Sequence, residues 1–182
     1  LYQKAMEGDK DCGGMIACNY YSGEPVTGLE EGRPMFLRRP DSHLGLANFM
    51  RSHLYASLAT LKIGLDILLK EEDVKIDSIT GHGGLFKTKG VGQSILAAAM
   101  NAPISVMETA GEGGAWGMAL LAAYMLFKKD GQSLGDYLDS RVFAERKSET
   151  MEPDPADVAG FETYTKQYQA CLAAEKAAVQ AF

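Results

Sequence analysis

The sequence predicts an α/β domain in which a sheet with parallel strands is flanked by helices. Two observations lead to this prediction. A β-branched run at residues 76–80 ends in the glycine-rich stretch 81–90, and a short apolar helix follows at 91–100. The same order then recurs, because a strand at 104–107 leads into the glycines of 111–114 and a second apolar helix. This succession implies a right-handed crossover and a parallel pair.

The first third of the chain is expected to contain a short strand and one long helix. Residues 16–21 are an apolar run that fits a strand, and the Gly, Pro and Glu of residues 22–34 indicate a loop. A helix is predicted over residues 42–70, with Asp41-Ser42 as its start signal. Spacings of three and four place one apolar stripe on this helix. Its members are Ala47, Met50, Leu54, Leu58, Leu61, Leu65 and Leu68. The opposite positions Arg51, Lys62 and Asp66 are expected to face water.

Three further helices are predicted downstream. Residues 115–127 are almost wholly apolar, so this helix should be buried on several sides. Ser133 followed by Asp136 resembles a capping box for a short helix. After a linker at 152–155 comes a last helix with an apolar stripe, formed by Phe161, Tyr164, Tyr168 and Leu172.

The composition excludes several classes of function. The formal charge is 18 − 24 = −6 and no basic stripe is present, which argues against a nucleic-acid partner. No apolar run reaches the roughly 20 residues of a membrane span, and no signal peptide is visible. Three cysteines without metal or redox spacing fit reduced thiols in the cytoplasm. Scattered histidines give no metal site. Because the chain begins at Leu1 inside an expected helix, we interpret it as a fragment of something larger.

The glycine stretch after the first parallel strand is the candidate binding site. Glycine removes the Cβ and allows positive φ, so Gly83 and Gly84 permit close approach of a phosphate or ribose to the main chain. A helix start just beyond adds N–H donors, and Lys87, Thr88 and Lys89 could add donors or charge. The stretch is neither a Walker A loop nor a dinucleotide fingerprint. A tight strand-to-helix turn that binds nothing remains the alternative.

The second glycine stretch is interpreted differently. At Gly113, Gly114 and Gly117 we favour tight helix packing over ligand contact, and for Glu112 we favour helix capping over cation binding. No nucleophile with a supporting base, no paired carboxylates and no zinc spacing are visible, so no catalytic residue is assigned to this chain.

Taken together, these motifs resemble the C-terminal domain of the FGGY carbohydrate kinases, and xylulokinase-like and ribulokinase-like members are most similar. The resemblance runs from about residue 16 to 172. It is carried by Tyr20-Tyr21-Ser22-Gly23-Glu24, the long helix, Gly81-His82-Gly83-Gly84, the segment from Glu112 to Ala123, and Glu152-Pro153-Asp154-Pro155. The family implies an actin-like ATPase fold, a pair of ribonuclease-H-like domains with ATP and sugar in the cleft between them.

The resemblance also implies roles for individual residues. Residues 81–84 would form the adenosine motif that begins at Gly81, with Gly83, Gly84 and Leu85 beside the ribose and α-phosphate. Thr88 or its neighbour Lys87 would lie near the adenine. Residues 113–117 would begin the second connecting helix, at the hinge between the two domains.

The same resemblance implies what lies elsewhere. The whole chain, 1–182, would be a single domain, the C-terminal adenosine-binding half of a two-domain sugar kinase, with 152–182 as a helix packing on it. The phosphate loops, the catalytic aspartate and most sugar contacts would belong to an N-terminal domain. The reaction would be attack of a sugar hydroxyl, of a ketopentose by our expectation, on the γ-phosphate of ATP with Mg²⁺. This chain alone is expected to be inactive.

Two other functions remain open from the sequence. One is a non-catalytic actin-like nucleotide-binding module used in regulation or assembly. The other is an α/β interaction domain without a ligand. The aromatic stripe of the last helix could pack on the missing domain or on a second copy of the chain, which would make a homodimer.

Overall fold

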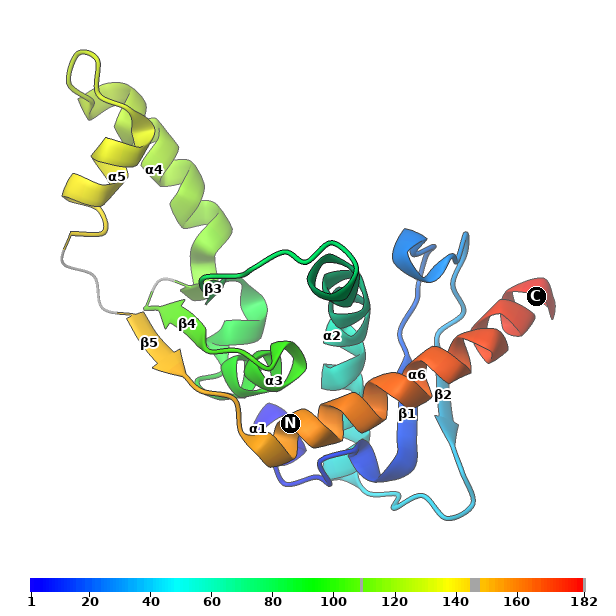
Figure 1. The fold of residues 1–182 in the computed structure, drawn as a ribbon. Coiled ribbons are helices and arrows are strands. Elements are labelled where there is room, and N and C mark those ends of the chain that lie inside the picture. The colour runs from blue at the N-terminus through cyan, green and yellow to red at the C-terminus, as the bar shows by residue number, and fades with distance from the viewer. Residues whose placement is uncertain (109, 145–147, 182) are drawn as a thin grey trace.

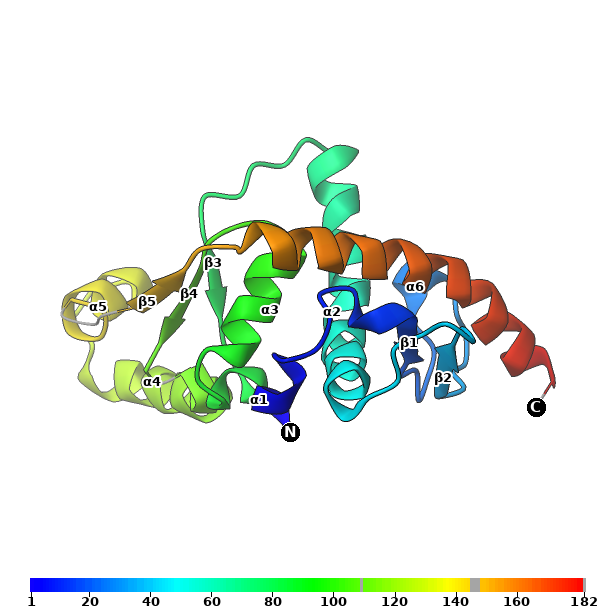
Figure 2. The same ribbon diagram turned by 90° about the horizontal axis from the view of Figure 1, so that it is seen from below.

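The computed structural model describes residues 1–108, 110–144 and 148–181, and Figures 1 and 2 show the chain from two sides. Its helices are α1 (Tyr2–Ala5), α2 (Leu46–Lys70), α3 (Val91–Met100), α4 (Gly113–Phe127), α5 (Leu134–Arg141) and α6 (Pro155–Ala181). Its strands are β1 (Met15–Cys18), β2 (Met35–Arg38), β3 (Ile79–Gly81), β4 (Ile104–Met107) and β5 (Ser148–Met151). Short 3-10 turns occur at Cys12–Gly14, Pro25–Thr27, Gly84–Lys87 and Ala110–Glu112.

The predicted parallel pair is present. β3 runs parallel to β4 with Ile79 opposite Ile104, and β5 adds to the other side of β4 in antiparallel orientation. β1 and β2 form a separate antiparallel ribbon in which Met15 lies opposite Arg38. The sequence did not predict β2 or β5, and the first strand is shorter than the predicted span 16–21.

The long helix is confirmed, but several details of its prediction are wrong. Leu61 and Leu68 of the predicted apolar stripe are exposed. The helix begins after Gly45 rather than at Ser42. Ser42 instead closes a turn, because its hydroxyl donates to the Gly14 carbonyl at 2.9 Å and accepts from the Arg39 amide at 2.9 Å. Arg51, expected in water, is fully buried. Its guanidinium bonds Asp157, 106 positions away in the sequence, which the helical pattern cannot reveal.

The main core lies where α2, α3, α6 and β1 meet. α6 crosses over α2 and β1, with α3 beside its first half (Figures 1 and 2). The predicted stripe of α6 is buried here, since Phe161, Tyr164 and Tyr168 are at most 1 % exposed. The Tyr164 hydroxyl donates to the carbonyls of Ser52 on α2 and Ala17 on β1, so the stripe also connects three elements by hydrogen bonds.

The apolar helix α4 is the largest departure from expectation. It was predicted to be buried on several sides, yet none of its described residues is buried. Met125 and Leu126 are each more than three-quarters exposed. α4 pairs with α5 in a hairpin that points away from α2 and α6 (Figure 1), and its apolar composition could not show which neighbour would cover it. Ser133 caps α5 as predicted, its hydroxyl accepting from the Asp136 amide at 3.1 Å. Among the described residues, no helix is both long and apolar enough to span a bilayer.

Candidate functional site

Both glycine stretches lie at one edge of the three-stranded sheet. β3 ends at Gly81 and β4 ends at Met107, and because the two strands are parallel their carboxyl ends meet at the same edge. The first loop passes through the 3-10 turn Gly84–Lys87 into α3, and the second leads into α4 (Figure 1). In open α/β sheets this edge is where ligands bind.

The two loops touch each other. The Lys87 ammonium lies 2.6 Å from Oε1 of Glu112, which joins the first loop to the second. A Cβ at Gly113 would lie 3.2 Å from the His82 ring, and one at Gly111 would lie 3.1 Å from the Lys87 side chain. Glycine at these positions therefore allows the loops to approach closely, which fits the packing role predicted for Gly113. At Gly114 and Gly117 a Cβ would meet no atom within 4 Å, so the packing predicted there is not found among the described residues.

Gly83 and Gly84 present open main chain, as a ligand-binding loop requires. A Cβ built at either position would meet no atom within 4 Å, so the space beside both residues is free. Gly83 has φ +107°, a conformation that side chains strongly disfavour. Its carbonyl accepts from the Phe86 amide at 3.1 Å, which fixes the turn while leaving the outer surface of the glycines accessible.

Gly81 and Leu85 face the interior side of the loop. Gly81 is buried, and a Cβ there would lie 2.3 Å from Cζ of Phe86. A Cβ at Gly92 would lie 2.5 Å from the Leu85 carbonyl oxygen, so the loop also packs tightly on the start of α3. Gly81, Leu85 and Phe86 line an apolar groove of about 380 Å³ between the loop and α2.

A hollow of about 370 Å³ lies on the other side of the loop. Thr88, Lys89 and Gly90 form one wall, and the ends of β4 and β5 form the other. The structure thus separates the candidate residues: Gly83 and Gly84 are open, Gly81 and Leu85 border the groove, and Thr88 borders the hollow. Lys87 extends toward the second loop, where it meets Glu112.

Gln93 is a site residue that the sequence reasoning missed. Its amide nitrogen donates to the carbonyls of Ile104 at 2.7 Å and Glu149 at 2.8 Å, and so connects α3 to β4 and β5. The Lys89 ammonium lies 3.3 Å from Oε2 of Glu149. Gln93 is the largest polar side chain in the helix 91–100, which is mostly apolar, and this was a detectable signal, whereas the polar segment of β5 gave none.

A family model describing the C-terminal domain of the FGGY family of carbohydrate kinases matches residues 2–126. The chain belongs to this family. The predicted relationship is therefore confirmed, and the match covers both glycine loops of this FGGY domain.

Solved structures give the fold of this FGGY domain. The similar chains include xylulose kinase from Lactobacillus acidophilus (TM-score 0.69, 20 % identity), gluconate kinase from the same organism (0.68, 20 %) and Plasmodium falciparum glycerol kinase with ADP (0.63, 18 %). The alignments cover 94 %, 94 % and 93 % of this chain but 33 % of each of those chains. The FGGY domain thus has the predicted ribonuclease-H-like, actin-like ATPase fold and spans about a third of the length of these proteins. A search of curated protein sequences finds no match.

The chemistry of the site in this FGGY domain is that of binding. Open main chain at Gly83 and Gly84 suits the phosphate or ribose oxygens of a ligand. Within residues 1–108, 110–144 and 148–181, no group of three or more His, Cys, Asp or Glu side chains is arranged to hold a metal ion.

Proposed function

We propose that this domain supplies the adenosine side of an ATP-dependent carbohydrate kinase, which transfers the γ-phosphate of ATP to a sugar hydroxyl. The observation that carries the proposal is the open main chain of Gly83 and Gly84 at the edge where the two glycine loops meet. The family match supports the same function, because its members are carbohydrate kinases.

Each candidate residue has a role in this proposal. Gly83, Gly84 and Leu85 lie beside the ribose and α-phosphate. Thr88 or its neighbour Lys87 lies toward the adenine. Thr88 borders the hollow that offers space there, whereas the Lys87 ammonium meets Glu112. Gly81 keeps the loop close to Phe86, so its contribution is to the shape of the adenosine motif.

The remaining machinery belongs, in this proposal, to an N-terminal domain of the same protein. That domain provides the phosphate loops, the aspartate that accepts the proton of the attacking hydroxyl, and most contacts to the sugar. Mg²⁺ enters with the phosphates of ATP and neutralises their charge, and the described residues of this chain offer no cluster of ligands for it. The isolated chain then has no kinase activity and at best weak nucleotide affinity.

We further propose a ketopentose, such as xylulose or ribulose, as the acceptor, and the cytoplasm as the location. The similar structures include xylulose kinases, a gluconate kinase and a glycerol kinase, so likeness of fold alone does not choose among acceptors. A panel of sugars with the complete protein, measured as ADP release, tests the acceptor directly.

A matched pair of valine variants tests the site. A Cβ at Gly84 would meet no atom of this chain within 4 Å, so we expect Gly84→Val in the complete protein to fold normally yet obstruct the nucleotide. We expect the KM for ATP to rise at least about 10-fold, as loss of roughly 1.4 kcal/mol of binding requires, with the KM for the sugar unchanged. Gly45→Val is the control, since Gly45 also has open space around its Cβ but lies before α2.

The outcomes separate the candidate functions. The kinase proposal is supported if the complete protein phosphorylates a sugar and if the KM for ATP rises in Gly84→Val but not in Gly45→Val. Nucleotide binding by the complete protein without turnover of any sugar would instead favour the non-catalytic nucleotide-binding module. Absence of ATP and ADP binding in calorimetry would favour an interaction domain without a ligand.

A further inference from the structure

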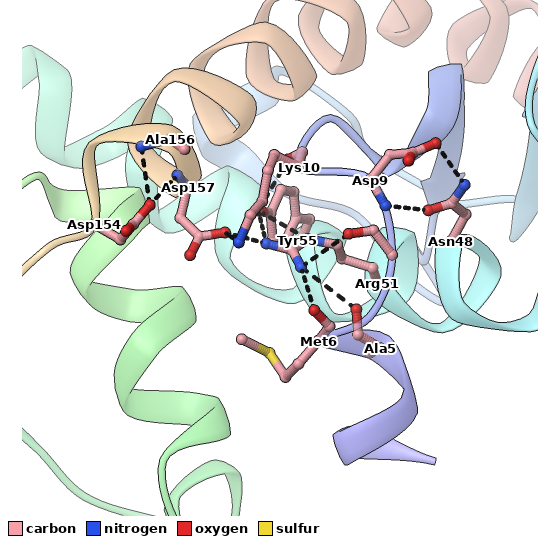
Figure 3. A network of polar contacts seen from close by, with 11 residues as sticks. Ala5, Met6, Asp9, Lys10, Asn48, Arg51, Tyr55, Asp154, Ala156 and Asp157 are labelled. Carbon is pink, nitrogen blue, oxygen red and sulfur yellow. Dashed lines mark hydrogen bonds and ion pairs between the residues drawn. The ribbon is translucent and has the colours of Figure 1, made fainter.

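The buried guanidinium of Arg51 joins three parts of the chain (Figure 3). Arg51 lies on α2, and one of its terminal nitrogens bonds both the Asp157 carboxylate near the start of α6 and, at 2.9 Å, the Tyr55 hydroxyl. The other terminal nitrogen points toward the N-terminal segment. Because the side chain is only 1 % exposed, water cannot replace these contacts without local opening.

The N-terminal contacts of Arg51 hold the end of α1. Nη1 donates to the carbonyls of Ala5 at 3.5 Å, Met6 at 3.4 Å and Gly8 at 3.4 Å. The last carbonyls of any helix lack partners within the helix, and a helix as short as Tyr2–Ala5 has little stability of its own. The planar guanidinium can serve these carbonyls and the carboxylate at once, which a lysine ammonium cannot do. Arg51 therefore fixes α1 on the body of the domain.

The opposite end of α1 reaches the glycine loop. The Gln3 side-chain amide donates to the Lys89 carbonyl at 3.4 Å, and Figures 1 and 2 both show α1 beside the segment that enters α3. Lys89 lies between Thr88, which borders the hollow, and Gly90, which has φ +80°. Glycine permits several backbone conformations, so the bond from Gln3 adds to the bond from the Val91 amide to the Thr88 carbonyl in setting the orientation of the Lys89 carbonyl.

We propose that Arg51 and Gln3 are positioning residues for the nucleotide loop. Arg51 fixes α1, Gln3 on α1 holds the Lys89 carbonyl, and residues 88–90 are thereby kept in the binding conformation. Neither side chain touches the nucleotide. This inference rests on the proposed function, because it assigns a determinant of affinity to the same site.

The test compares three variants of the complete protein. Gln3→Ala removes the exposed contact with the Lys89 carbonyl and leaves the core unchanged. Arg51→Lys retains the charge opposite Asp157 but loses the contacts with the carbonyls of the N-terminal segment. The third variant combines both substitutions. The matched control is Lys4→Ala on the same helix, since Lys4 pairs with Glu7 and makes no contact with the loop among its described interactions. Calorimetry gives the ATP affinity, and hydrogen exchange gives the protection of the Val91 and Ser94 amides that close the loop.

We expect Gln3→Ala to weaken ATP binding about 2- to 5-fold, which is the effect of one net hydrogen bond. Arg51→Lys should give a similar loss, and the double variant should bind no worse than Arg51→Lys, because the two residues act in series. Both single variants should also speed exchange at Val91 and Ser94. A purely structural role for Arg51 would lower the stability of Arg51→Lys but leave the folded variant with the ATP affinity of the wild-type protein.

Two results would overturn the inference. One is wild-type ATP affinity and exchange in Gln3→Ala, and the other is an additive loss in the double variant. If the wild-type protein binds no ATP, the proposed function fails instead. The exchange measurement then still shows whether α1 holds the loop.

Discussion

Replacing Arg51 by methionine should destabilise the domain far more than replacing Lys10 by methionine, although both cations pair with the same oxygen. Oδ1 of Asp157 accepts from Arg51 and also lies 2.8 Å from the Lys10 ammonium (Figure 3). The Arg51 side chain is 1 % exposed, whereas that of Lys10 is 46 % exposed. The two variants share the partner Asp157 and the new methionine side chain, and they differ in how deeply the replaced cation is buried.

The magnitude follows from what each change leaves behind. Removing one partner of a buried ion pair costs about 3–5 kcal/mol, because the other charge remains without compensation. In Arg51→Met the Lys10 ammonium still pairs with Asp157, and this favours the lower end of the range. The loss is increased because three backbone carbonyls, those of Ala5, Met6 and Gly8, lose their hydrogen-bond donor. A half-exposed ion pair contributes at most about 1 kcal/mol, so Lys10→Met should fall below that value.

Urea denaturation of both variants, followed by circular dichroism at 222 nm, measures the two losses. A difference near 3 kcal/mol would be a large part of the roughly 5–15 kcal/mol that stabilises a typical domain. The reasoning is refuted if Arg51→Met loses less than about 1 kcal/mol, or if the two variants lose the same amount.

Three further changes test other features of the structure. Gly81→Ala should destabilise by about 1–3 kcal/mol, because its Cβ would lie 2.3 Å from the Phe86 ring, which must move. Glu175→Gln should stabilise by about 1 kcal/mol in urea denaturation, since Oε2 of this buried carboxylate has no hydrogen-bond partner among the described residues. At pH 8 Cys171 should react with a thiol reagent before Cys18, because burial raises the pKa of Cys18 to about 12 and keeps it protonated.

Each of these predictions has a result that contradicts it. Gly45→Ala has open space at its Cβ and should lose only the N-cap preference of glycine at the start of α2, about 1 kcal/mol or less. A loss at Gly81 no larger than this would show that the ring contact is unimportant. A lower free energy of unfolding for Glu175→Gln than for the wild-type protein would mean that neighbouring groups compensate the charge of the Glu175 carboxylate. Cys171→Ser should abolish the fast phase of thiol modification, and its persistence would assign that phase to another cysteine.

Local patterns predicted the elements whose geometry depends on nearby residues. The helix over residues 46–70 follows from its apolar spacing, and the turn at Gly83 follows from the need for positive φ. The parallel pairing of β3 and β4 follows from the order of strand, loop and helix. The strands β2 and β5 were missed for different reasons. The short apolar run of β2 lies between Pro34 and Pro40, which indicate a loop, and β5 is mostly polar and exposed.

The candidate site was predictable only in part. Glycine content identified Gly83 and Gly84, because freedom from a Cβ is a property of the residue itself. Gln93 joined the site through bonds to Ile104 and Glu149, and the contact between Gln3 and Lys89 spans 86 positions. Such contacts depend on how distant segments pack, and no local pattern encodes them.

The amino-acid sequence by itself determined the long helix, the parallel pair β3 and β4 with the helices that follow them, the family and the position of the glycine loop. Only the tertiary structure decided that Arg51 is buried and that α4 is exposed. The physical reason is that periodicity shows which residues share a helical face, whereas burial depends on the partner that the rest of the chain brings to that face. Arg51 finds Asp157 and Tyr55 there, whereas α4 meets the small helix α5, where Tyr124 packs against Tyr137, and none of its described residues is buried.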